Sequence, residues 1–164
     1  MQLYRVPLAL HRHIDNTAGT SETVHATIKQ WESIAMSQLR VTVWNEGVHE
    51  RVDAKVRELY PNGMGGQIAQ YLEKQPGIAT VRVCELHYDE QGLPDDVLNS
   101  ADVMTWWGHK AHKELTEENV ERVHKRVLDG MGLIVLHSGH HSKIFKKLMG
   151  TSCNVSVSVF FIRT

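Results

Sequence analysis

The regular alternation of short β-branched segments with helical segments restricts this chain to an α/β fold. Strand patterns occupy residues 39–44, 79–86, 101–107 and 133–137, and segments with helical spacing separate them. Strands that alternate with helices pair in parallel, because each helix carries the chain back across a face of the sheet. The pattern predicts a three-layer, flavodoxin-like open parallel sheet. Residues 154–162 alternate as a fifth strand, and the expected strand order is 2-1-3-4-5.

Helical spacing and chain breakers predict the segments between the strands. Residues 47–61 read as one helix that Pro61 stops, and residues 65–75 as a second. A third helix over 115–132 has Thr116 as its cap and ends on Gly130, and a last helix covers 140–150. Residues 133–137 are nearly all apolar, which is typical of a strand covered on both faces.

The first 36 residues read differently from the rest. They mix polar and small residues, and a short helical pattern begins near Ser21 with Val24, Ile28 and Trp31 on one face. We expect residues 1–36 to be an N-terminal extension and residues 37–164 to be a single α/β domain.

Charge and cysteine content limit the expected partners and compartment. Lys plus Arg total 18 against 19 Asp plus Glu, so no overall field attracts nucleic acid or an anionic membrane. No apolar run approaches the roughly 20 residues of a membrane span. The two cysteines are too few for a disulfide framework, and no secretory signal is recognisable at the N-terminus. We expect a cytoplasmic protein without nucleic-acid or membrane partners.

Histidines and polar residues gather where the first, third and fourth predicted strands end. Ligands of open parallel sheets bind beyond the carboxyl ends of the strands, near the point where strand order reverses. The residues that follow these three strands are Asn45, Glu46 and His49, then His109 and His112, then His137 and His140. We expect the three loops to converge on one hollow.

A shared metal is one interpretation of these histidines. At least three of His49, His109, His112, His137 and His140 would bind a divalent ion such as Zn, with one position left open. In the alternative, His109 and His112 cap the helix that follows them and hydrogen-bond to carbonyls. Positions away from this edge favour solvated or capping roles for His25, His87 and His124, and His141 is expected on a helix surface.

Three further features allow a functional and a structural interpretation. Trp106 and Trp107 alternate faces, so at least one belongs to the core, and Trp107 could line a sugar site. The glycine-rich residues 62–66 make a turn, with phosphate binding as the alternative. Ser138 lacks the G-x-S-x-G context of a strained nucleophile elbow, so we expect it to hydrogen-bond substrate.

The segments VTVWNEGVHE, WWGHKAH and GMGLIVLHSGHHSKIFKKLMGTSC resemble the ThuA-like trehalose-utilisation family over residues 37–153. The resemblance implies a class I glutamine amidotransferase-like fold, a sugar or oxidised sugar substrate and a metal, with His137 at a histidine position that recurs in the family. The amidotransferase cysteine is missing, since Ser138 and Gly139 stand at the elbow. Relatives continue beyond the position of Cys153, so we expect a domain incomplete at its C-terminal end and an exposed sheet edge that favours a homo-oligomer.

The leading hypothesis is a trehalose or related disaccharide utilisation protein that acts on a sugar or keto-sugar, as an isomerase or hydrolase. His137, His109 and Glu46 would be catalytic, and Asn45, Trp107 and Ser138 would bind substrate. The alternative is a noncatalytic ligand-binding or oligomerising module of the same fold. We expect neither nucleotide nor flavin, because residues 45–50 lack the Ser, Thr and Gly run that holds a phosphate.

Overall fold

The computed structural model describes residues 38–154, which form a four-stranded parallel sheet in the order β2-β1-β3-β4. The strands are β1 (Leu39–Asn45), β2 (Ile78–Glu85), β3 (Val103–Trp107) and β4 (Gly132–Leu136). The predicted flavodoxin-like fold is confirmed, and so is the order of these four strands. The predicted fifth strand and the N-terminal extension lie outside the described residues.

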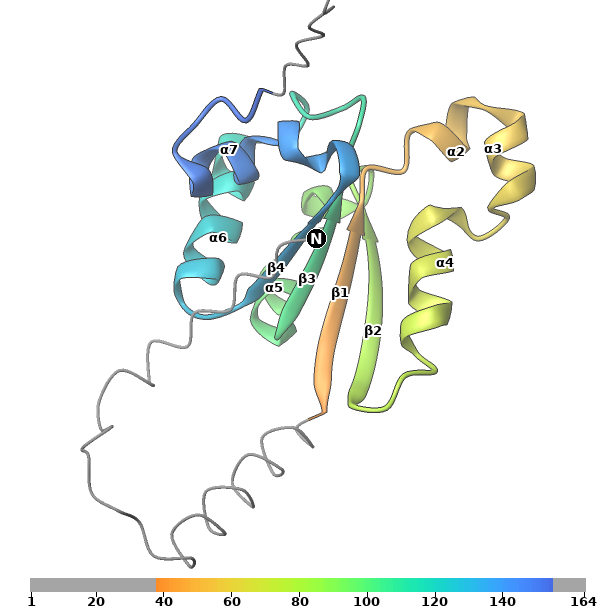
Figure 1. The fold of residues 1–164 in the computed structure, drawn as a ribbon, viewed down its shortest axis with the longest axis horizontal. Coiled ribbons are helices and arrows are strands. Elements are labelled where there is room, and N and C mark those ends of the chain that lie inside the picture. Colours follow the sequence, from red (N-terminus) through yellow and green to blue (C-terminus); the bar gives the residue numbers. More distant parts are fainter. Residues whose placement is uncertain (1–37, 155–164) are drawn as a thin grey trace, which may run out of the picture.

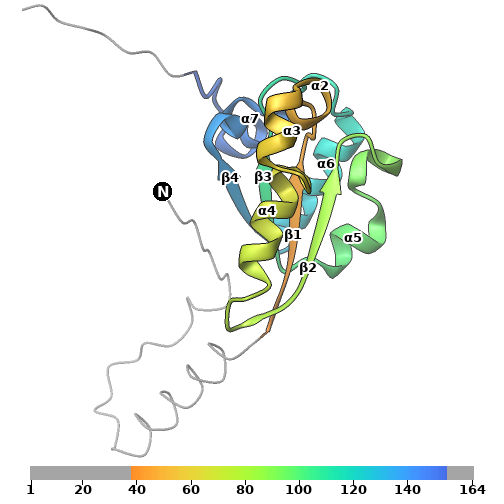
Figure 2. The same ribbon diagram turned by 90° about the vertical axis from the view of Figure 1, so that its right-hand side faces the viewer.

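Helices cover both faces of the sheet, which gives three layers (Figure 1). They are α2 (His49–Val52), α3 (Ala54–Leu59), α4 (Gly63–Leu72), α5 (Asp95–Ser100), α6 (Glu117–Leu128) and α7 (Lys143–Met149), with 3-10 helices η1 (Asp89–Gly92) and η2 (His137–His141). Figure 2 shows α4 in front of β1 and β2, with α5 and α6 behind the sheet. None of the helices between residues 38 and 154 has the length and apolar character that a membrane crossing requires.

The core lies mainly between the sheet and the α5–α7 layer. Trp44 and Trp106 stack there with ring centroids 3.8 Å apart, and Met104 is fully buried beside them. On the opposite face α4 approaches the sheet closely. A Cβ on Gly65 would lie only 3.1 Å from the Val83 side chain, which is a tight contact that glycine avoids.

The chain following β1 differs from the prediction of one helix. Asp53 breaks this segment, because its side chain accepts a 2.9 Å hydrogen bond from the Lys55 amide and starts α3 as a new helix. The prediction of a continuous helix through residues 47–61 is therefore wrong. Val52 and Leu59, which share its expected apolar stripe, are 67% and 73% exposed.

The β4 strand is not covered on both faces by the residues that the structure describes. Leu133 and Val135 pack against the core, whereas Ile134 on the other face is 36% exposed. The reason is that α4 lies over β1 and β2 and does not reach β4 (Figures 1 and 2). The apolar sequence of β4 therefore did not suffice to predict that both faces of this strand are buried.

The predicted ends of α6 are confirmed. The Thr116 hydroxyl accepts a hydrogen bond from the Asn119 amide at 3.3 Å, and Gly130 follows the helix with a positive φ of 110°. The last helix starts later than predicted. Ser142 caps α7, and residues 137–141 form the separate turn η2.

Candidate functional site

The loops that follow β1, β3 and β4 open at the carboxyl end of the sheet, at the top of Figure 1. The first loop and the end of β3 bring together His49, Trp107 and His109. The ring centroids of the two histidines are 5.2 Å apart, and that of Trp107 is 5.7 Å from His49. We call these three residues the His49–His109 group. Its half-buried Trp107 contrasts with the neighbouring Trp106, which is only 1% exposed and is core, as the alternation predicts.

A second group contains His112, His140 and His141. The ring centroids of His140 and His141 are 4.0 Å apart, and those of His112 and His141 are 6.3 Å apart. Burial lowers the pKa of His112, the charges of His141, His109 and Lys146 lower it further, and Glu46 opposes them. Burial also lowers the pKa of His141, together with His140 and Lys146. Both imidazoles are therefore held mainly neutral near pH 7.

His137 lies at the turn where β4 meets η2, and its carbonyl oxygen is 3.0 Å from the Nδ1 atom of His140 in the second group. Its side chain is exposed, and its backbone has a φ of +43°, in the left-handed region that a residue with a Cβ rarely adopts. The Ser138 hydroxyl is buried and donates a 2.9 Å hydrogen bond to the carbonyl of Gly108. The strain that a hydrolase elbow places at its serine is thus present one residue earlier, at His137.

Asn45 and Glu46 hold the loops that carry the imidazoles. The buried Glu46 carboxylate accepts hydrogen bonds from the Lys110 amide at 2.8 Å and the Ala111 amide at 2.9 Å. The Asn45 side chain donates to the Glu50 carboxylate at 2.8 Å and accepts from the Gly47 amide at 3.2 Å. Both residues therefore act on the site through the backbone that they position.

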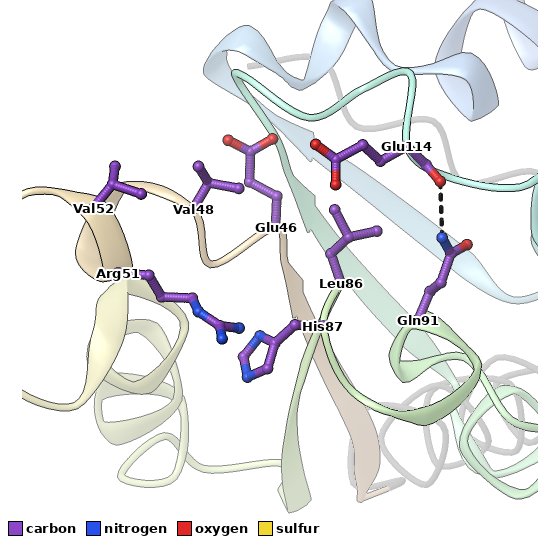
Figure 3. A pocket seen from close by; sticks show the side chains of 8 residues that line it. All are labelled: Glu46, Val48, Arg51, Val52, Leu86, His87, Gln91 and Glu114. Carbon is purple, nitrogen blue, oxygen red and sulfur yellow. Dashed lines mark hydrogen bonds between the residues drawn. The ribbon is translucent and has the colours of Figure 1, made fainter.

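A cavity of about 380 Å³ opens beside Glu46, between the loops that follow β1 and β2 (Figure 3). Its lining residues are Glu46, Val48, Arg51, Val52, Leu86, His87, Gln91 and Glu114. Figure 3 shows Arg51 and His87 side by side on one wall, with the carboxylates of Glu46 and Glu114 on another. The cavity offers an apolar surface bordered by cationic and anionic groups.

Two neighbouring acidic residues that sequence reasoning missed are the buried Glu50 and the half-buried Glu85. The Nδ1 atom of His87 is 3.1 Å from a carboxylate oxygen of Glu85, the last residue of β2. Burial raises the pKa of Glu85, and Glu50 raises it further, whereas His87 and Arg51 lower it. The rule that ligands bind beyond strand ends applies to Glu85 as well, but β2 is the outermost strand on its side of the described sheet, away from β3 and β4.

Residues 62–66 form a turn, as the structural interpretation of their glycines predicts. Gly63 has a positive φ of 71°, and the next amide, that of Met64, donates a 2.9 Å hydrogen bond to Glu50. The Met64 amide is therefore already bonded to the Glu50 carboxylate, and it is not available to bind a phosphate.

The expected convergence is partial. The structure brings His49 to His109, and His112 to His140 and His141. Among residues 38–154 no group of three or more His, Cys, Asp or Glu is arranged to hold a metal ion. The metal site at His49, His109, His112, His137 and His140 stays a prediction. His25 lies outside the described residues, His124 is half-buried on α6, and His87 lines the cavity.

Comparison with known proteins identifies the family. A search of curated proteins finds no match to the chain. A family model described as trehalose utilisation matches residues 40–159, which is more than half of the 164 residues and includes the four described strands except for Leu39 at the start of β1. The resemblance seen in the sequence is confirmed, and the chain belongs to the ThuA trehalose-utilisation family.

Proposed function

We propose that this trehalose-utilisation domain acts on a sugar or keto-sugar derivative at the carboxyl end of its sheet. The observation that carries the proposal is the His49–His109 group, in which a half-buried indole lies beside two imidazoles. An indole ring packs against the apolar C–H face of a sugar, and imidazoles exchange protons near neutral pH. The group therefore combines a binding surface with acid–base groups.

Proton abstraction next to a carbonyl is the reaction that suits these residues. The imidazole of His109 would take a proton from the carbon adjacent to the carbonyl, and the C–H electrons would form an enediol as a second acid protonates the carbonyl oxygen. The protonated His109 then returns its proton to the former carbonyl carbon, while the hydroxyl on the adjacent carbon gives up its proton to the conjugate base of the acid and becomes the new carbonyl, which completes the isomerisation. His137 is the proposed acid that protonates the carbonyl oxygen. Its strained backbone holds an exposed imidazole at the same end of the sheet as His109.

The proposal also includes a divalent metal ion bound by the histidines. The ligands would come from His49, His109, His112, His137 and His140, and a bound ion such as Zn would polarise the sugar carbonyl. Elemental analysis of the purified full chain tests this element separately. A stoichiometric transition metal that is lost in His49→Ala and His109→Ala supports it, and a metal-free active protein contradicts it.

Deuterium exchange provides the direct test of the reaction. The full chain is incubated in D2O with a keto derivative of trehalose, and NMR follows exchange of the proton adjacent to the carbonyl. We expect exchange that falls about 100-fold in His109→Gln, within the usual contribution of a general base. His124→Gln on α6 is the matched control and should exchange at the wild-type rate. Equal exchange in the two variants would contradict the assignment of His109.

The second candidate is a noncatalytic ligand-binding or oligomerising module. The half-exposed β4 strand, with Ile134 36% exposed, favours it as a surface where copies could associate. Light scattering of the wild type and of Ile134→Lys distinguishes the candidates. A homo-oligomer that Ile134→Lys dissociates, without any deuterium exchange activity in the wild type, would favour the module over the enzyme.

A further inference from the structure

A second cavity, of about 570 Å³, lies between the loop after β3 and the start of α7. Most of the residues that line it are basic, and the full set is Lys110, Ala111, His112, Lys113, Glu114, His141, Lys143 and Lys146. We call this the basic cavity. Four lysines and one glutamate line it, in a chain whose total charge is −1 at pH 7. The positive charge is therefore local to this hollow and is not a property of the whole surface.

Most of this charge is not neutralised by neighbouring carboxylates. Lys143 forms an ion pair with Glu117 at 2.8 Å and also donates to the Leu115 carbonyl at 2.6 Å. For the other three lysines of the basic cavity, no ion pair joins them to a carboxylate within residues 38–154. By contrast Lys147, the neighbour of Lys146 on α7, points away and pairs with Glu121.

The four lysines of the basic cavity come from α7 and from one anchored loop. Lys143 and Lys146 are three positions apart on α7, where like charges repel each other. Lys110 and Lys113 belong to the loop after β3, which the buried carboxylate of Glu46 anchors through the Lys110 and Ala111 amides. The anchored backbone keeps Lys110 and Lys113 at the rim of the same cavity as Lys143 and Lys146, and a bound anion would offset the repulsion among the four charges.

We infer that the basic cavity binds the anionic substituent, a phosphate ester or a carboxylate, of a sugar derivative. The anionic part of this inference rests on the lysines alone, and the sugar part rests on the function proposed above. A volume of about 570 Å³ is within the range of small-molecule sites, so a monosaccharide unit fits beside the anion. Lysine ammonium groups bind such oxygens as point charges, and His112 and His141 offer ring nitrogens for hydroxyl groups.

Calorimetry on the full chain tests the anion site with inorganic phosphate as the first probe. We expect the variant Lys113→Gln with Lys146→Gln to bind phosphate about tenfold more weakly or worse, because two charged contacts are removed. Lys147→Gln removes the same kind of charge from the same helix outside the cavity, and it should change the affinity by less than about twofold. No binding of phosphate, or equal weakening in both variants, would overturn the inference.

Paired sugars then identify the source of the anion. Trehalose 6-phosphate is compared with trehalose, and glucuronate with glucose. Tighter binding of either anionic sugar than of its neutral partner, abolished in the double lysine variant, supports the inference and names the substituent. Equal affinity for anionic and neutral sugars overturns it. Trp107→Ala separates the two proposals, since it should weaken trehalose binding and leave inorganic phosphate binding unchanged.

Discussion

The carboxylate of Glu46 accepts a 2.9 Å hydrogen bond from the backbone amide of Ala111, a residue 65 positions later in the chain. This contact ties the end of β1 to the loop after β3. The loop carries His109 and His112 and also two lysines of the basic cavity, so one buried side chain positions parts of both candidate sites. Its role follows from its place between adjacent strands of the sheet.

Glu46→Gln should lower the free energy of unfolding by about 1.5–3 kcal/mol, the range for hydrogen bonds to a charged group. The reason is that an amide supplies one oxygen where the carboxylate supplies two to the Lys110 and Ala111 amides. Urea denaturation measures the change. Glu114→Gln is the control, because Glu114 is exposed and accepts a bond from Gln91 only through its backbone carbonyl. Similar losses in both variants would contradict the role of Glu46.

His137→Gly should stabilise the fold and remove activity. A residue with a Cβ at a φ of +43° carries about 1–2 kcal/mol of strain that glycine avoids. Glycine also loses more backbone entropy on folding, so we expect a net gain of about 0.5–1 kcal/mol. His137→Ala keeps the Cβ, so it should lose activity without a gain in stability. Denaturation and deuterium exchange on both variants check the pair, and a destabilised His137→Gly would argue against strain.

The two tryptophans at the end of β3 should respond differently to truncation. Trp106→Ala removes the stack on Trp44 from a fully packed core and should cost about 3–5 kcal/mol of stability. Trp107→Ala removes a half-buried ring and should cost less than about half of that, while weakening sugar binding at least about tenfold, or 1.4 kcal/mol. Thermal unfolding and calorimetry separate the effects. Unchanged sugar affinity in Trp107→Ala would exclude it from the binding surface.

Glu85→Gln should stabilise the protein increasingly as the pH rises above 4.5, the ordinary pKa of a glutamate. Burial and Glu50 raise the pKa of Glu85 in the folded state. The folded chain therefore binds the proton more tightly than the unfolded chain does, and this contribution is lost as the pH rises through the folded pKa. A glutamine at this position does not ionise, so the variant does not lose stability in this way as the pH rises. Urea unfolding of both proteins from pH 4 to pH 8 measures the difference, which should be flat below 4.5. A difference that is constant over the whole range would refute the raised pKa.

Local sequence patterns predicted most of the fold because strands and capped helices depend on short-range chemistry. The β-branched runs located all four described strands within about two residues, the usual uncertainty of such boundaries. Thr116 and Gly130 bounded α6 through a cap and a left-handed turn. The exception is the segment after β1. Its apolar spacing favours one helix, but Asp53 caps a second helix, α3, within it.

The sequence by itself determined the α/β class, the strand order consistent with its crossovers, the family and the edge of the sheet where polar residues collect. Only the tertiary structure decided which of those residues meet. Parallel packing delivers loops to one edge, but the direction of each side chain depends on contacts between segments far apart in the chain. Thus His49 faces His109, Glu46 holds a backbone loop, and Glu85 pairs with His87. Spacing along a chain carries no information on such contacts, because they arise from packing across the sheet.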